Sequence, residues 1–324
     1  MLSSLVHRIL GRGHHATARF TLPPVVFEVA PGFVAGAALE GSRRKGRRVR
    51  KLSLQALSPR SVDPHLSRAN ITNTEEFSRV TSSLIPAVGN ADGRFGLVLP
   101  DGAMRVALLS FEDLPHNSDA AEALIRWRMK DKLPFNVEEA RATYQVLSQA
   151  PGRIEILALA MRASVIAEYE AAFSSLNGGA ALIVPATVAL LPLLPEAGSS
   201  AQMLIHVCDQ WLTIVVIADG VPCAWRTREL DPADLPNYER EIATEAARVL
   251  ASTREQVHSD LSRVWFCARP AAESKLTAMI SETLDRDVTP LRPPAELVSM
   301  LTPADRSIFE QFGTTIAGLM ANAT

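Results

Sequence analysis

The sequence of 324 residues has few of the features that mark specialised classes of protein. Its three cysteines, Cys208, Cys223 and Cys267, form no CxxC pair, so they predict no disulfide framework and are typical of a reducing compartment. Lys and Arg number 33 and Asp and Glu number 35, so the net charge gives no reason to expect binding to nucleic acid. No apolar run approaches the roughly 20 residues that a membrane-spanning helix needs.

Motifs of the common nucleotide-binding and hydrolytic enzymes are also missing. The chain contains no GxGxxG fingerprint, no GxxxxGKT loop, no HExxH pair and no GxSxG elbow. The sequence therefore excludes the usual dinucleotide-binding, P-loop, zinc-protease and serine-hydrolase sites, and we expect no metal site.

The first half of the chain alternates between short strands and helices. Residues 25–39 predict two strands that meet at a turn near Pro31 and Gly32, and residues 51–57 predict a half-buried strand. Residues 74–88 predict a helix capped by Asn73 or Thr74. Strands in hairpins followed by a helix are typical of an α/β lobe.

The second half repeats this order after a Gly-Ser-Ser boundary at 198–200. Strands are expected at 203–208, 212–218 and 221–229, the last two joined by a hairpin turn at Asp219 and Gly220. A helix at 238–252 follows, and a final helix is expected over 304–320. Because the pattern occurs twice, the sequence predicts two α/β lobes.

Two segments are candidates for contact with a membrane surface. Seven of the nine residues 43–51 are Lys or Arg, beginning with Arg43 and ending with Lys51. The run can touch phosphates or lipid headgroups, but a solvated hairpin tip is favoured because no aromatic residue interrupts it. Apolar residues within 1–12 are spaced as on an amphipathic helix, either as a short membrane anchor or as a frayed terminus.

Several small groups of reactive side chains also have two interpretations. His206, Cys208 and the adjacent Asp209 can form a nucleophilic or metal-binding group, although lining of an inactive cleft is favoured. His14 and His15 lack further metal ligands nearby in the sequence. An aromatic residue at helical spacing, such as Trp127, is more often part of a core than of a docking surface.

The segment 123–147, ALIRWRMKDKLPFNVEEARATYQVL, is the most distinctive in the chain. It resembles the PilM family of type IV pilus assembly proteins, with order of elements similar over nearly the whole chain. The matching residues are Trp127, Leu133-Pro134-Phe135, Glu138-Glu139 and Tyr144-Gln145-Val146-Leu147.

This resemblance implies a two-lobed actin-like fold with ribonuclease-H-type sheets, an inserted small α+β subdomain and a shortened second lobe. It implies an extension at 1–24, a first lobe at 25–96 and 178–200, the insert at 97–177 and the second lobe at 201–291. Residues 292–324 are expected to return to the first lobe. The cytoplasmic domain of the GspL family of type II secretion proteins is similar in fold class.

The nucleotide motifs of that family are degenerate in this sequence. Where the family has the phosphate hairpin "DIGSSSVK", this chain has Glu28, Ala30 and Pro31, and the proline removes a backbone donor. The second hairpin, "VDIG" in the family, contains His206 and Cys208, with Asp209 one residue on. The adenosine turn "SGGGA" is matched by a segment with Arg269 and no glycine. We therefore expect a pseudo-ATPase without cofactor, and the alternative is a divergent ATPase that binds ATP and Mg²⁺.

The resemblance also implies a function. It predicts a non-catalytic scaffold of the type IV pilus, or of a related secretion machine, that is cytoplasmic and peripheral at the inner membrane. The implied partner is the cytoplasmic N-terminal tail of a PilN-like membrane protein, together with other platform components. Trp127, Leu133 and Phe135 are the expected partner-binding residues.

Overall fold

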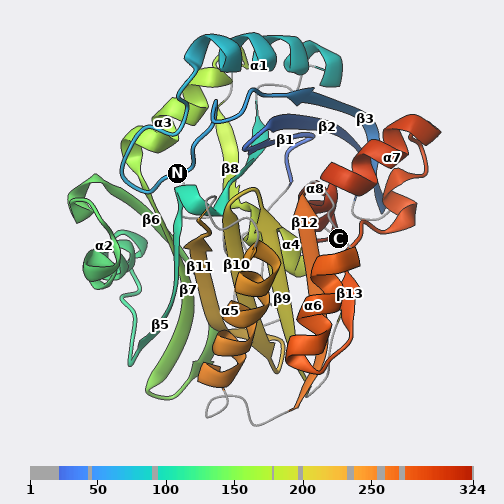
Figure 1. Ribbon diagram of the computed structural model, residues 1–324. Coiled ribbons are helices and arrows are strands. Elements are labelled where there is room, and N and C mark those ends of the chain that lie inside the picture. The colour runs from blue at the N-terminus through green and yellow to red at the C-terminus, as the bar shows by residue number, and fades with distance from the viewer. Residues whose placement is uncertain are drawn as a thin grey trace.

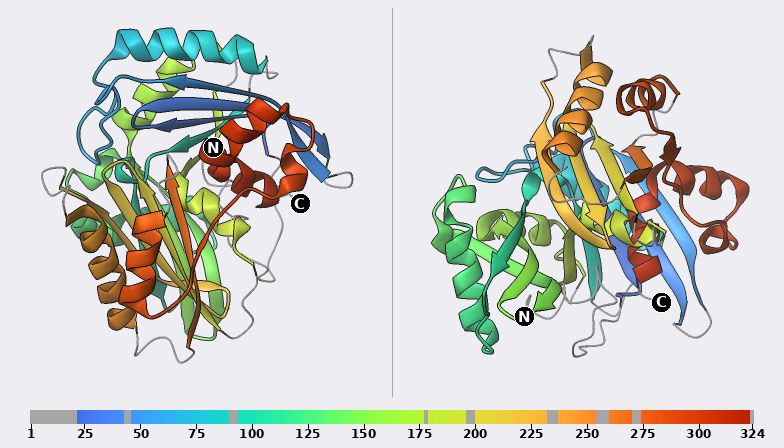
Figure 2. Two further views of the ribbon diagram at one scale, coloured as in Figure 1. Left: turned by 45° about the vertical axis from the view of Figure 1, so that its right-hand side comes forward. Right: turned by 90° about the horizontal axis from the view of Figure 1, so that it is seen from below.

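The structure is a computed structural model that describes residues 22–42, 46–89, 94–176, 179–195, 200–231, 237–253, 260–269 and 274–322. Two five-stranded sheets form two lobes, and a smaller three-stranded sheet lies beside them (Figures 1 and 2). Residues 1–12 and Arg43–Lys45 lie outside the described residues.

The first lobe is built on a sheet with the order β3-β2-β1-β4-β8. Its strands are β1 (Val25–Ala30), β2 (Phe33–Ser42), β3 (Gly46–Ala56), β4 (Phe95–Leu99) and β8 (Ala180–Pro185). The first three strands form an antiparallel meander, and β1, β4 and β8 run parallel to one another. The predicted turn between two strands at Pro31 and Gly32 is therefore confirmed.

The second lobe repeats this arrangement with the order β11-β10-β9-β12-β13. Its strands are β9 (Ala201–Cys208), β10 (Trp211–Ala218), β11 (Val221–Glu229), β12 (Leu261–Arg269) and β13 (Val288–Pro290). Again three strands form an antiparallel meander, and β9, β12 and β13 are parallel. Two sheets of this one type confirm the predicted pair of ribonuclease-H-like lobes.

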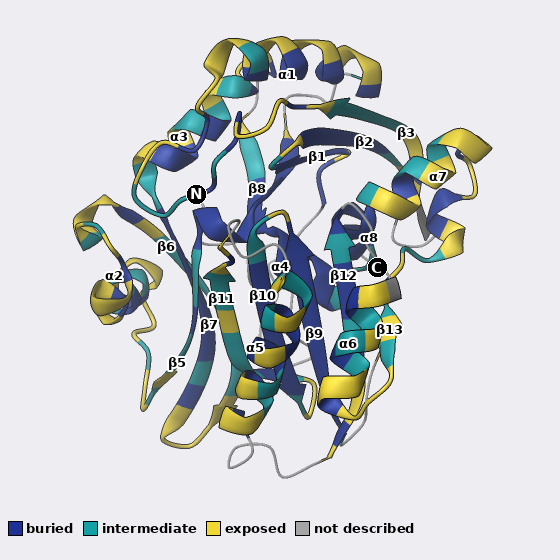
Figure 3. Cartoon of the chain, viewed as in Figure 1, coloured by how far each residue is buried: buried dark blue, intermediate teal, exposed yellow. Residues whose placement is uncertain are grey.

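Helices cover both faces of the first sheet. Figure 1 shows α1 (Thr74–Val88) and α3 (Ala163–Ala172) over one face, and α4 (Ala186–Leu190) and α8 (Thr314–Asn322) over the other. The predicted cap of α1 is Asn73, whose side chain accepts a hydrogen bond of 3.0 Å from the backbone N–H of Glu76. Outward-facing turns of α1 are exposed, whereas β1 is buried along its whole length (Figure 3).

The second sheet lies between two apolar layers. On one side it packs against α5 (Tyr238–Thr253) and α6 (Ser274–Leu284), which contact each other. On the other side a cluster joins it to the end of α4 and the 3-10 turn η4 (Leu191–Leu193). Because α4 belongs to the first lobe, this second layer is also a contact between the lobes.

The small sheet has the order β5-β7-β6, with β5 (Arg105–Phe111), β6 (Ala140–Ala150) and β7 (Arg153–Arg162). Its outer face packs against α2 (Ser118–Arg128), and its inner face joins the core of the first lobe. The expected boundary at residue 97 falls inside β4, and α3 packs in the first lobe through Tyr169 and Phe173. The small domain is therefore narrower than the predicted insert at 97–177.

The C-terminal segment returns to the first lobe but is not one helix. A single helix over 304–320 was the expectation, and the structure has α7 (Pro303–Phe312) and α8 separated at Gly313. Gly313 packs against the ring of Phe309, where a Cβ atom would lie 2.3 Å from Cδ2. Glycine is a weak helix former, and here it permits both the break and the close packing.

Much of the basic run 43–51 lies on a strand. β3 begins at Gly46, so Arg48, Arg50 and Lys51 are exposed side chains of a strand, with Val49 buried between them. Among the described residues, no helix has both the length and the apolar character needed to cross a bilayer.

Candidate functional site

The hairpins that face each other between the lobes pack through apolar side chains. Ala30, Phe33 and Ala35 of the β1–β2 hairpin form one cluster with Cys208 at the end of β9. Phe33 meets Phe312 of α7 edge to face, with ring centroids 5.0 Å apart. At the outer ends of the hairpins, Pro31 is half-buried and Asp209 is exposed. The two hairpins therefore contact each other through apolar side chains.

Deeper in the same seam, the side chains of Glu28 of β1 and Arg269 at the end of β12 form an ion pair. The other oxygen of Glu28 accepts a hydrogen bond from Thr315, in the first turn of α8. Arg269 also donates to Thr315 Oγ1 at 3.4 Å. All three side chains are buried, so each lobe holds a charge that only the other lobe neutralises.

The network continues from Arg269 to His206 of β9, with 3.3 Å between Nη2 and Nε2. His206 Nδ1 lies 2.9 Å from Oδ2 of Asp101, in the short 3-10 turn η1 (Asp101–Ala103) after β4. Thr187 of α4 binds Asp101 through its hydroxyl at 2.6 Å and its backbone N–H at 2.9 Å. Asp101 and Thr187 come from the first lobe and His206 from the second.

Burial acts against the charged forms of Asp101 and Arg269, and at Asp101 hydrogen bonds more than offset it. Burial on its own raises the pKa of Asp101, but hydrogen bonds from His206 and Thr187 outweigh it and leave the pKa below its ordinary value. Burial lowers the pKa of Arg269 to about 9. Because this value is still above neutral pH, the guanidinium is protonated there. The site is thus a buried polar network that contains the Glu28–Arg269 ion pair and the Asp101 carboxylate.

The residues of this seam do not suit Mg²⁺ and a polyphosphate. A water-bound magnesium needs a free carboxylate, whereas both oxygens of Glu28 face partners from the chain itself. Phosphate cradles need glycine-rich backbone with free donors, whereas Ala30, Phe33 and Cys208 bring side chains together here.

A nucleophilic or metal-binding role for Cys208 is also disfavoured. Burial, followed by the nearby Asp101 and Asp209 carboxylates, raises the pKa of the Cys208 thiol far above its ordinary value, so the reactive thiolate is suppressed. Within the described part of the chain, no three His, Cys, Asp or Glu side chains are grouped as metal ligands.

The structure brings Glu28, His206 and Arg269 into one network and places Ala30 beside Cys208. Sequence reasoning missed Asp101, Thr187 and Thr315. Asp101 follows an apolar strand and precedes a glycine, which reads as a surface turn; only its burial, at 5% exposed, reveals its part in the network.

The three expected partner-binding residues do not share one surface. Trp127 is 64% exposed on α2, so the alternative interpretation that it is a core residue is wrong. Leu133 is buried in the core of the small domain, which leaves it no surface for a partner. Phe135 is half-buried beneath the Arg162 guanidinium, 6.0 Å from the ring centroid.

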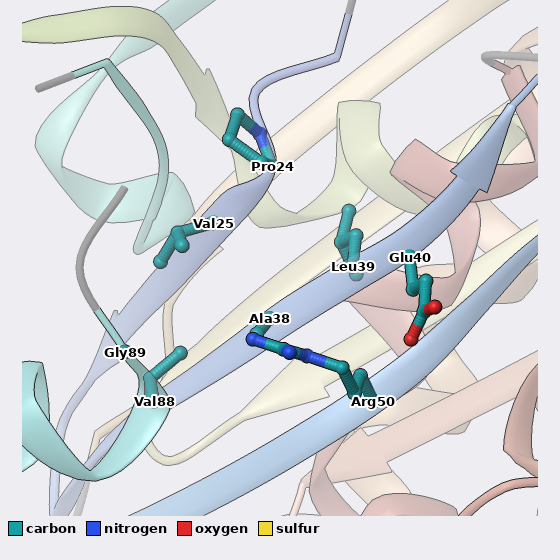
Figure 4. A pocket seen from close by; sticks show the side chains of 8 residues that line it. All are labelled: Pro24, Val25, Ala38, Leu39, Glu40, Arg50, Val88 and Gly89. Atoms are coloured by element: carbon teal, nitrogen blue, oxygen red, sulfur yellow. The ribbon is translucent and has the colours of Figure 1, made fainter. Parts of the chain in front are cut away.

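The surface of the described residues includes a smaller and a larger hollow. The smaller, of about 270 Å³, lies between β2, the start of β1 and the end of α1. Figure 4 shows Arg50 reaching across it toward Gly89, where a cation is favoured by the C-terminal end of α1. The larger, of about 590 Å³, lies between β5 and β11.

Comparison with solved structures shows which fold this arrangement represents. The chain is similar to a PilM–PilN complex of type IV pilus biogenesis, with a TM-score of 0.74 and 14% identity over 94% of this chain and 99% of that chain. It is also similar to a Bacteroides thetaiotaomicron protein of actin-like ATPase fold and unknown function (TM-score 0.53, 8% identity, 86% and 94% covered). The predicted actin-like fold and the PilM resemblance are confirmed at the level of the fold.

A weaker similarity is to the cytoplasmic domain of EpsL, from the type II secretion system of Vibrio cholerae, with a TM-score of 0.43 and 8% identity over 80% of this chain and 93% of that chain. No protein-family model and no curated sequence matches the chain.

Proposed function

We propose that the chain is a non-catalytic actin-like scaffold of a type IV pilus, or of a related secretion platform, at the cytoplasmic face of the inner membrane. In this role it binds the cytoplasmic N-terminal tail of a PilN-like membrane protein and joins other platform components. The similarity to PilM in its complex with PilN, over 94% of this chain, is the observation that carries the proposal.

The direct contacts between the lobes support the proposal that this chain carries out no nucleotide chemistry. Actin-like ATPases open and close around a nucleotide, which requires an accessible cleft and free phosphate ligands. Here the Glu28–Arg269 pair and the Asp101–His206 contact link the lobes directly. Opening the seam would leave these charges unpaired, which disfavours a cycle of that kind.

A tail of this type would bind as an extended peptide, through backbone hydrogen bonds and a few apolar pockets. Among the expected contact residues, Trp127 is accessible and Phe135 is partly so. A large exposed aromatic side chain is the kind of residue that supplies most of the energy of a small interface.

Titration with the partner's tail tests the binding role. The probe is the N-terminal peptide of a protein with one membrane-spanning helix whose gene neighbours the gene of this chain. Calorimetry measures its binding to the full-length chain. We expect saturable binding, and Trp127→Ala weakens it while Arg79→Gln on α1 does not. Absence of binding at millimolar peptide contradicts the proposal.

Thermal melting in Mg·ATP tests the pseudo-ATPase role separately. We expect no change of melting temperature in millimolar Mg·ATP. A ligand present at about 100 times its dissociation constant stabilises a protein by about 2.7 kcal/mol, so even moderate affinity would be visible. A shift that requires both ATP and Mg²⁺ would instead support the divergent ATPase.

A further inference from the structure

The larger hollow lies where two sheet edges face each other. β5 is an edge strand of the small sheet and β11 is an edge strand of the second lobe, and the two strands contact one another (Figure 1). Edge strands present backbone donors and acceptors on the side that has no neighbouring strand. Between them lies the hollow of about 590 Å³, whose lining includes the whole stretch from Met104 to Leu108 and that from Cys223 to Thr227. We call this hollow the edge groove.

The edge groove is rich in positive charge. Arg105, Lys132 and Arg226 line it, against the single carboxylate of Asp131. Arg105 Nε is buried and has no hydrogen-bond partner among the residues that the structure describes. Burial, and after it the charge of Arg226, lowers the pKa of Arg105, so an anion in the groove would relieve both costs.

Arg226, unlike Arg105, has a carboxylate partner, because its Nε lies 3.1 Å from Oε1 of the buried Glu245 of α5. That carboxylate also faces Arg228, with 3.4 Å between Nη1 and Oε2. Because Arg248 also lies 3.5 Å from Oε2, Glu245 is shared among three guanidinium groups and compensates none of them fully. Arg226 is therefore partly neutralised within the fold, whereas Arg105 forms no ion pair with a carboxylate among the described residues.

One wall of the groove is held in place before any ligand arrives. Trp225 Nε1 donates to Thr227 Oγ1 at 3.2 Å, and Thr227 Oγ1 lies 3.1 Å from Thr213 Oγ1. Thr213 donates in turn to Asp101 Oδ2 at 3.2 Å, in the buried network between the lobes. A wall fixed by such contacts lowers the cost of ordering on binding.

We propose that the edge groove binds an extended, acidic segment of a partner protein as an added β-strand. Backbone groups of β5 or β11 would pair with the segment, an acidic side chain would meet the guanidinium of Arg105, and apolar side chains would contact Met104 and Leu108. The lining of the groove includes neither Trp127 nor Phe135, the residues expected to contact the tail, so the two proposals can fail or succeed independently.

The primary test is fluorescence anisotropy with the full-length chain and a labelled short peptide of alternating glutamate and valine. We expect saturable binding that Arg105→Gln weakens at least about tenfold, as loss of a charge-assisted pair does, with Arg105→Lys intermediate. Arg79→Gln on α1 is the matched control and leaves binding unchanged. Equal binding of Arg105→Gln, or equal binding of a lysine–valine peptide, overturns the proposal.

Inorganic phosphate separates a peptide site from a simple anion site. We expect phosphate to compete with the peptide only weakly, because it lacks the backbone groups. If phosphate binds in the groove and the peptide does not, the proposal is wrong.

Cys223 gives a second readout that needs no substitution of Arg105. It lines the groove and is half-buried, whereas Cys208 and Cys267 are buried in the core. We expect the glutamate–valine peptide to slow the reaction of Cys223 with N-ethylmaleimide in the wild-type chain, measured by peptide mass mapping. An unchanged rate at saturating peptide contradicts occupation of the groove.

Discussion

Glu28 and Arg269 form an ion pair across the two lobes, and each side chain is only 1% exposed. A lone buried charge is far more costly than a buried pair. The pair therefore holds the two lobes together. Removing either partner leaves the other charge buried without a counter-charge.

Replacement of Arg269 tests how much this ion pair stabilises the chain. We expect Arg269→Met to lower the free energy of unfolding by about 3–5 kcal/mol, because Glu28 is left buried without its counter-charge. Urea denaturation followed by circular dichroism measures the change.

The matched control is the double variant Glu28→Leu with Arg269→Met. Replacing both partners by apolar side chains removes the unpaired charge, so the double variant should recover most of the lost stability. If the double variant is as unstable as the sum of its single variants, the two side chains do not act as a pair.

Acid should weaken the contact between Asp101 and His206, which also joins the lobes. The pKa of Asp101 is lowered in the folded chain, so its stabilising contribution is present above its ordinary value of 3.8 and is lost as the pH falls through the lowered pKa. We expect the free energy of unfolding to fall below about pH 4 from this cause. Asp101→Asn should reduce this acid-dependent loss of stability. The urea midpoints of the wild-type chain and the variant, measured at pH 7, 4 and 3, test this. If the variant loses as much stability between pH 7 and pH 3 as the wild-type chain does, Asp101 is not the cause of the acid-dependent loss.

Close approach of the lobes should make Gly102 intolerant of a side chain. A Cβ atom at Gly102 would lie 2.1 Å from Cε2 of Trp211, at the start of β10. We expect Gly102→Ala to cost about 1–3 kcal/mol, the usual penalty for overpacking. In a Trp211→Leu background the same change should cost less, and additive penalties in this double-mutant cycle would show that the two residues do not meet.

Trp127 should contribute little to stability despite its size. Because 64% of it is exposed, we expect Trp127→Ala to change the free energy of unfolding by no more than about 0.5 kcal/mol. Thermal melting measures this. Ile125→Ala is the contrast on the same helix, since a fully buried side chain should cost about 2–5 kcal/mol. A large loss at Trp127 would mean that it packs against the small domain after all.

Local signals in the sequence were reliable where a short-range contact decides the conformation. The turn at Asp219 and Gly220 was predicted from its residue types, and both residues adopt positive φ, at 52° and 75°. The Asn73 cap is of the same kind, because its hydrogen bond spans three residues. The helix expected over 304–320 failed at Gly313, since packing against Phe309 outweighs the continuous apolar pattern.

By itself, the sequence determined the repeated order of strands and helices, and hence two lobes of one type, because periodicity and turn residues are properties of neighbouring positions. It also marked Glu28, His206 and Arg269 as departures from a nucleotide motif. Only the tertiary structure decided that these residues meet and that Asp101, Thr187 and Thr315 complete their network. Thr315 lies 287 residues from the carboxylate that it binds, and no local pattern carries information about a partner that only the closure of the two lobes brings near.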